Sequence, residues 1–150
     1  MSPIGTIREP LQQSFLAPAF EDATVLDAMR VGVVSCPPDT SLREVARVMA
    51  TYRIHCVLVT EVEGDKPWGL VSDIDVAAAA GADVDRLTAR EAARTEIVTV
   101  AADASMKLAA QLMAERGAAH LVVVQPHSGH PVGVLSTLDL AGVLACGGTV

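Results

Sequence analysis

Apolar side chains recur along this chain with two spacings, which separates predicted helices from predicted strands. Continuous apolar runs at residues 55–60 and 120–125 are typical of strands that are covered on both faces. A helix is predicted to begin at Ser41, where Glu44 completes a capping box. Its apolar face has the three-to-four spacing of an amphipathic helix and consists of Leu42, Val45, Ala46, Val48 and Met49.

The same order of elements occurs twice: helix, strand, helix, strand, strand, helix. Thr24 and Thr88 each open a short helix with a capping box, because an acid follows three residues later. The first copy then has predicted strands at 31–35, 55–60 and 67–71 and a last helix at 73–80. The second copy has predicted strands at 96–100, 120–125 and 131–135 and a last helix at 137–145.

The two copies align without a gap at a constant offset of 64 residues. Residues 24–80 match residues 88–144, and fifteen of the 57 pairs are identical. A repeat of this kind decides the architecture and has to be found first. Each copy has fewer than 70 residues, which is marginal for a domain that folds alone. We therefore expect the two copies to stabilise each other.

The resulting organisation is an N-terminal arm at 1–23, repeat 1 at 24–80, a linker at 81–87, repeat 2 at 88–146 and a tail at 147–150. Alternating helix and strand periods predict an α/β fold of the α+β type, in which helices cover small sheets. The arm contains both phenylalanines, Phe15 and Phe20, and is predicted to dock on a surface such as that of a dimer partner.

Composition argues against several classes of protein. The net charge of −7 and the pI near 4.9 argue against a general nucleic-acid binder. There is no apolar run of 18 residues for a membrane span and no apolar signal region at the start. Three cysteines that do not repeat at offset 64 are typical of reduced thiols, which predicts a cytoplasmic protein.

Each third strand ends in the pattern Gly-x-x-Ser-x-x-Asp. The residues are Gly69, Ser72 and Asp75 in copy one, and Gly133, Ser136 and Asp139 in copy two. A helix start exposes unpaired N–H groups that suit a phosphate, the serine can donate to it, and the carboxylate can hold two ribose hydroxyls. The same pattern is also a capping box, which stabilises any helix. Both interpretations stay open from the residues alone.

The doubled pattern resembles a tandem pair of cystathionine-β-synthase (CBS) domains, the Bateman module. The resemblance covers about residues 24–146 and rests on the repeat length, the element order, Val25–Met29, Val34–Ser41 and the two motif endings. It implies two pseudo-symmetric repeats packed through their sheets. It also implies clefts for adenine nucleotides, and dimerisation of the module.

By the family pattern, serine and aspartate of each ending touch phosphate and ribose, and the adenine rests near the first and second strands. The implied ligand-binding residues are Ser72, Asp75, Ser35, Cys36, Cys56 and Val57 in copy one, and Ser136, Thr137, Asp139, Thr99, Val100, His120 and Leu121 in copy two. Basic candidates near the motifs are Arg53, His55, Arg116 and His120.

The ligand is expected to be AMP, ADP, ATP or an S-adenosyl compound, with Mg²⁺ accompanying a polyphosphate. Sparse basic residues favour a mono- or diphosphate or an adenosyl ligand over ATP. Asp73, which faces Thr137 in the alignment, would repel a phosphate. The cleft with Ser136, Thr137 and Asp139 is therefore predicted to bind phosphate better.

The leading hypothesis is a stand-alone regulatory module that binds an adenine ligand, forms a homodimer and signals to an unknown effector protein. A structural dimerisation module with vestigial clefts is the alternative. Catalysis is not expected, because Cys56 lies in an apolar strand and no nucleophile–base set is evident. His127 and His130 lack a third metal ligand, so we expect loop histidines and no metal site.

Overall fold

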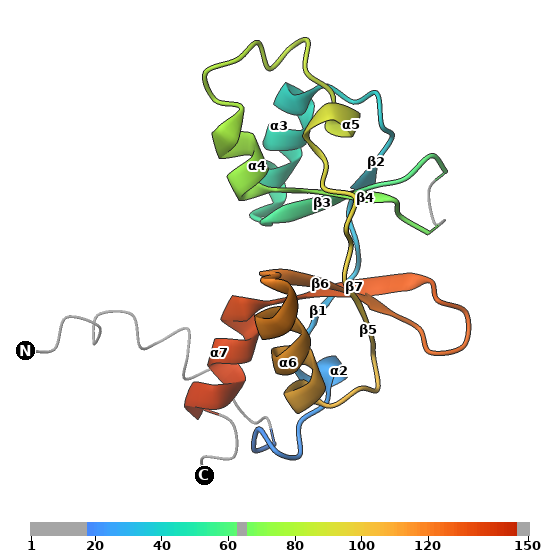
Figure 1. Cartoon of the computed structure of the whole chain (residues 1–150), viewed down its shortest axis with the longest axis vertical. Helices are drawn as coiled ribbons and strands as arrows, with labels where there is room; N and C mark the ends of the chain where they lie inside the picture. Colours follow the sequence, from blue (N-terminus) through green and yellow to red (C-terminus); the bar gives the residue numbers. More distant parts are fainter. Residues whose placement is uncertain (1–17, 63–65, 147–150) are drawn as a thin grey trace, which may run out of the picture. The chain divides into compact units, whose positions relative to one another are not determined.

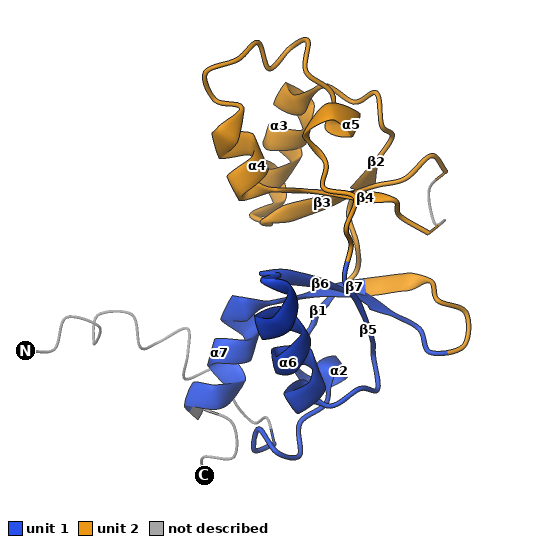
Figure 2. Cartoon of the chain, in the orientation of Figure 1, with its two compact units in different colours: residues 1–31, 98–126, 133–150 blue, residues 32–97, 127–132 orange. Residues whose placement is uncertain are grey.

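The computed structural model describes residues 18–62 and 66–146, which divide into two compact units (Figures 1 and 2). Described residues within 1–31, 98–126 and 133–150 belong to unit 1, and those within 32–97 and 127–132 belong to unit 2. Each unit combines a small sheet with helices, so the α/β class predicted from the sequence is confirmed.

Unit 2 contains a three-stranded sheet in the order β2-β3-β4, in which β3 pairs parallel with β2 and antiparallel with β4. Helices α3, α4 and α5 belong to the same unit. The elements are β2 (Ser35–Cys36), α3 (Leu42–Tyr52), β3 (Cys56–Val59), β4 (Gly69–Ser72), α4 (Asp73–Ala78) and α5 (Ala89–Ala92).

The core of unit 2 lies between this sheet and α3. The apolar face that the sequence predicts for α3 supplies the buried residues Leu42, Val45 and Met49. They pack with alternate residues of the strands and with the first residue of α5, namely Val57, Val59, Val71 and Ala89. Because strand side chains alternate between faces, Cys56, Leu58 and Ser72 belong to the opposite face of the sheet.

Unit 1 contains a four-stranded sheet in the order β1-β7-β6-β5. Helices α6 and α7 pack on each other (Figure 1), and α2 contacts α7. The elements are α2 (Val25–Ala28), β1 (Arg30–Val31), β5 (Thr99–Ala101), α6 (Met106–Arg116), β6 (His120–Val124), β7 (Pro131–Ser136, assigned to this unit from Gly133 on) and α7 (Thr137–Cys146).

The short helix that opens each sequence repeat lies in the unit formed by the other repeat's later elements. In unit 1, the Val25 N–H donates to the Ala104 carbonyl at 2.8 Å and Met106 N–H donates to the Ala23 carbonyl at 2.9 Å. In unit 2, Ala89 N–H donates to Thr40 and Leu42 N–H to Leu87, both at 2.8 Å. These bonds are related by the offset of 64, so sequence repeats and compact units divide the chain differently.

The capping boxes predicted for the opening helices are confirmed at Thr24 with Asp27 and at Thr88 with Glu91. The box predicted at Ser41 is only half correct. The Ser41 hydroxyl accepts from Glu44 N–H at 3.2 Å, but the Glu44 carboxylate pairs with Arg47. A neighbouring arginine on the same helix face therefore replaces the reciprocal bond to the backbone.

The single strand predicted at 31–35 is wrong. Arg30 and Val31 pair with β7 in one sheet, whereas Ser35 and Cys36 pair with β3 in the other. Gly32 lies between them with φ of 91°, a conformation that glycine adopts without a steric penalty and that ends the strand. The strand predicted at 96–100 also begins late, because β5 spans Thr99–Ala101.

Most of the predicted N-terminal arm, including Phe15, lies outside the described residues, and Phe20 is half-buried in a turn. Across residues 18–62 and 66–146, no helix is long and apolar enough to cross a membrane.

Candidate functional site

In unit 2 the motif forms the junction between β4 and α4. Asp75 Oδ2 accepts hydrogen bonds from both the backbone N–H and the hydroxyl of Ser72, each at 2.9 Å. Ser72 is buried, and the Asp75 side chain is only 12% exposed. The motif is therefore built as a capping box, as one of the two interpretations of the sequence predicts.

In unit 1 the junction between β7 and α7 has the same geometry. Asp139 Oδ2 accepts from the backbone N–H and the hydroxyl of Ser136, again at 2.9 Å each. Asp139 N–H in turn donates to Ser136 Oγ at 3.2 Å. The two motifs thus share one arrangement in addition to one sequence pattern.

A basic residue that the sequence analysis missed completes the motif of unit 2. Arg94 Nε donates to Asp75 Oδ1 at 3.0 Å. Arg94 also exchanges two backbone bonds of 2.9 Å with Leu70, which fixes its position against β4. The equivalent residue of unit 1 is Arg30, whose backbone lies opposite Val134 in β7. The identity of Arg30 and Arg94 at offset 64 was the sequence signal that could have identified them.

These bonds limit what the motif carboxylate can still accept. A carboxylate has about four acceptor positions. At Asp75 three of them are used by the Ser72 N–H, the Ser72 hydroxyl and Arg94. Only one acceptor position therefore remains for the two ribose hydroxyls that the sequence analysis expects. To bind both, the ligand would have to displace Arg94 or turn the Ser72 hydroxyl away.

The motif glycines allow the backbone of the opening segment to approach. A Cβ on Gly133 would lie 2.4 Å from the Arg30 carbonyl oxygen, and one on Gly69 would lie 3.0 Å from Ala93 Cβ. Both contacts are made by the segments that carry Arg30 and Arg94. The absence of a side chain at these glycines therefore allows the segments with Arg30 and Arg94 to lie directly against the motif.

Two further predicted residues lie at the same edge of unit 2. Cys56 is directly opposite Ser72 in the pairing of β3 and β4, and it is buried. His55 accepts the backbone N–H of Asp73 at its carbonyl, at 2.9 Å, and its ring Nδ1 lies 2.8 Å from Asp73 Oδ2. The Asp73 carboxylate therefore already has a basic partner, which weakens the argument that it would repel phosphate.

The residues predicted to line the adenine position lie farther along the sheet. Ser35 is opposite Leu58, so it lies roughly 12 Å from Ser72 across β3, given the usual strand spacing and rise. Cys36 and Val57 pack against the core beneath α3, where Val57 is buried and Cys36 is half-buried. Burial raises the pKa of the Cys36 thiol, which disfavours the thiolate that nucleophilic chemistry needs.

In unit 1, the residues predicted to contact the adenine occupy the equivalent positions of the sheet. Thr99 is opposite Val122 in the β5–β6 pair, and it is exposed. Val100 and Leu121 are buried, so their side chains belong to the core of that unit. His120 is half-buried at the start of β6, and Thr137 is exposed at the start of α7.

Arg53 and the equivalent residue of unit 1, Gly117, adopt the same left-handed backbone conformation at different steric cost. It ends α3 in the left-handed region with φ of 54°, and its N–H donates to the Met49 carbonyl. Gly117 ends α6 in the same way, with φ of 59° and a bond to Met113. A non-glycine residue in this region costs about 1–2 kcal/mol. Arg53 is the single non-glycine residue with positive φ in the part of the chain that the structure describes.

Metal ligation has no support in the described ranges 18–62 and 66–146, where no group of three or more histidine, cysteine or acidic side chains is arranged to hold an ion.

The sequence model of the CBS domain matches residues 20–81 and 89–146. Together with the doubled fold and the doubled motif, this match places the chain in the CBS domain family. No curated protein sequence matches the chain.

Solved CBS domain structures resemble the chain over most of its length. One is a CBS domain protein from Pyrobaculum aerophilum complexed with AMP, at 27% identity and a TM-score of 0.70, with 82% of this chain and 98% of that chain covered. A CBS domain pair in complex with 5′-methylthioadenosine and S-adenosyl-L-methionine has 19% identity and a TM-score of 0.73, with 82% and 96% covered.

A third structure is the CBS domain of a bacterial CNNM/CorC family Mg²⁺ transporter in complex with ATP. It has 15% identity and a TM-score of 0.73, with 85% of this chain and 91% of that chain covered. At identities of 19% and 15%, the second and third likenesses support the fold alone.

Proposed function

We propose that this chain is a regulatory CBS pair that binds an adenine-containing ligand at its Ser–Asp motifs. The observation that carries the proposal is the match at 27% identity to nearly the whole of a CBS domain protein complexed with AMP. The two motifs support it, because each places a serine hydroxyl and a carboxylate together at a strand-to-helix junction. AMP is the ligand that we propose first.

The role is regulatory and not catalytic. Cys56 is buried, burial keeps the Cys36 thiol protonated, and the His55 ring is engaged with Asp73. Ligand binding would act on an effector protein by favouring one arrangement of the module, to the extent that the ligand binds the two arrangements with different affinity. Homodimer formation, an effector partner, Mg²⁺ with a polyphosphate and a cytoplasmic location remain predictions from the sequence.

A direct test is thermal unfolding with AMP, ADP, ATP, NADH and S-adenosylmethionine. A ligand present at 100 times its Kd stabilises the folded protein by about 2.7 kcal/mol. For a chain of this size we therefore expect Tm to rise by roughly 5–10 °C with at least one of these compounds. The absence of any shift at millimolar concentration would contradict the proposal.

A structural dimerisation module is the second candidate function. It is favoured by the observation that three bonds already occupy the Asp75 carboxylate. On this alternative the motifs only cap α4 and α7. Replacing Ser72 or Ser136 would then lower stability, no compound would raise Tm, and mass spectrometry of the heat-released fraction would find no adenine compound in natively purified protein.

A further inference from the structure

The hydrogen bond between Arg94 and Asp75 joins two side chains of very different exposure. The Asp75 side chain is 12% exposed, whereas that of Arg94 is 61% exposed. A carboxylate that is largely removed from water needs hydrogen-bond donors, because an unpaired charge there is costly. The guanidinium has no such need, since water can solvate it when it leaves the carboxylate. Asp75 therefore needs a donor at Oδ1, but that donor does not have to be Arg94.

The backbone of Arg94 is held independently of its side chain. Its N–H and carbonyl exchange two hydrogen bonds with Leu70, each of 2.9 Å. The preceding residue, Ala93, lies so close to β4 that a Cβ on Gly69 would be 3.0 Å from its own Cβ. These contacts keep the segment against the strand whether or not the guanidinium touches Asp75. The side chain can therefore turn away from the motif while the backbone stays in place.

The two oxygens of the Asp75 carboxylate have separate partners. Oδ2 accepts from the N–H and the hydroxyl of Ser72, so the helix cap uses it fully. Oδ1 accepts from Arg94. A carboxylate oxygen has about two acceptor positions, so Oδ1 can accept both neighbouring hydroxyls of a ribose once Arg94 has moved. Exchange at Oδ1 would leave the cap of α4 intact.

We propose that Arg94 is a gate at the motif of unit 2, which occupies Asp75 Oδ1 until the two neighbouring hydroxyls of a ribose displace it. This inference rests on the proposed function and adds a means of regulation at one of its two motifs. The gate lowers the affinity for every ligand that uses Asp75, because binding must first break the contact with Arg94. The three hydrogen bonds at Asp75 are then the closed state of a binding site.

Calorimetric titration of AMP into Arg94→Met tests the gate. The reference protein and the variant both carry Asp139→Asn, so that only the motif of unit 2 keeps its carboxylate. Methionine keeps a long side chain but has no strong hydrogen-bond donor. We expect the Kd of AMP to fall about fivefold, which corresponds to a gate that is closed in about 80% of the molecules. A dideoxy analogue of AMP that lacks both ribose hydroxyls should gain less than about twofold, because it does not compete with Arg94.

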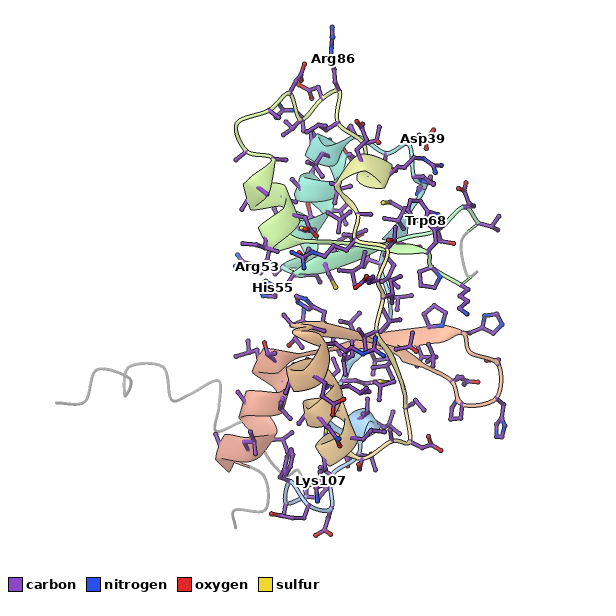
Figure 3. The ribbon with its side chains drawn as sticks, in the orientation of Figure 1. Asp39, Arg53, His55, Trp68, Arg86 and Lys107 are labelled. Atoms are coloured by element: carbon purple, nitrogen blue, oxygen red, sulfur yellow. The ribbon has the colours of Figure 1, made fainter. Side chains whose placement is uncertain are left out.

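Arg90→Met is the matched control, because Arg90 belongs to the same segment but contacts the other end of β4. Its guanidinium lies 5.3 Å from the centroid of the Trp68 ring and 3.3 Å from a carboxylate oxygen of Glu61. Figure 3 shows the labelled Trp68 at the end of unit 2 away from His55, whose carbonyl accepts the N–H of Asp73 in the motif. Arg90→Met should leave the AMP affinity within about twofold of the reference, because it does not touch Asp75.

The proposal is overturned if Arg94→Met weakens AMP binding or leaves it unchanged, because Arg94 would then bind the ligand or serve only the fold. It is also overturned if the dideoxy analogue or the Arg90→Met control gains as much affinity. If Asp139→Asn alone binds no AMP, Arg94→Met should make binding measurable, and its failure to do so would overturn the gate but not the proposed function. If wild-type protein binds no adenine compound, the proposed function fails and this inference fails with it.

Discussion

Units 1 and 2 share a backbone plan but differ in the charges placed on it. The same offset of 64 relates their capping boxes, the hydrogen bonds of their opening helices and the left-handed ends of α3 and α6. In contrast, Arg53, His55 and Asp73 of unit 2 correspond to Gly117, Ala119 and Thr137 of unit 1. The comparison teaches that the repeat determines where the motif residues lie, whereas the differences between copies change the charges that surround each motif.

The largest difference in stability is expected at the motif glycines. Gly133→Ala places Cβ 2.4 Å from a backbone oxygen of Arg30, which can move only with the strand. Gly69→Ala meets the side chain of Ala93 at 3.0 Å, which requires a smaller shift. We expect losses of about 3 kcal/mol and about 1 kcal/mol respectively, measured by urea unfolding. Equal losses would show that the opening segments approach the two motifs equally closely.

A smaller contrast is expected between the motif serines. Removing a capping serine costs about 1 kcal/mol. Ser72→Ala should cost more than Ser136→Ala, roughly 2 against 1 kcal/mol, because Ser72 is 5% exposed and Ser136 is half-buried. Chemical denaturation of both variants checks this order. A greater loss for Ser136→Ala would mean that burial does not distinguish the two caps.

The smallest effect concerns the ion pair between Arg43 of α3 and Asp85 of the linker, in unit 2. The Arg43 side chain, through its hydrogen bond and charge, holds the pKa of Asp85 below its ordinary value of 3.8. A lowered folded-state pKa gives stability that is present above pH 3.8 and is lost as the pH falls through the lowered value. Asp85→Asn should therefore differ slightly from wild type near neutral pH and converge with it in acid.

Because both side chains of this pair are exposed, added salt should reduce the difference. Glu21→Gln in unit 1 is the matched control, since Glu21 and Lys107 stand at the positions equivalent to Asp85 and Arg43. An Asp85→Asn difference that persists unchanged at high salt and low pH would contradict an electrostatic origin.

Local structure was largely predictable from the sequence. The capping boxes at Thr24 and Thr88, the apolar face of α3 and the strand-to-helix motifs depend on residues within one turn of each other, and spacing alone reveals them. The break at Gly32 was missed because Val31, Val33 and Val34 continue the β-branched pattern on both sides of it.

Partners that are distant in the sequence could not be predicted in the same way. Periodicity gives the elements but not the segments against which they pack, so the position of each opening helix with the other repeat's later elements was not expected. Arg94 was missed for this reason, since it lies 19 residues after Asp75. The hydrogen bond between the His55 ring and the Asp73 carboxylate likewise changed the expected effect of an extra carboxylate.

The most direct test of this account is calorimetric titration of AMP into Asp75→Asn and Asp139→Asn. Asparagine keeps a capping oxygen in each motif but removes the carboxylate charge. We predict that at least one of the two substitutions weakens AMP binding about tenfold or more, with about 1.4 kcal/mol corresponding to each tenfold step. AMP binding that both variants retain at wild-type affinity would contradict the proposal that the Ser–Asp motifs bind the ligand.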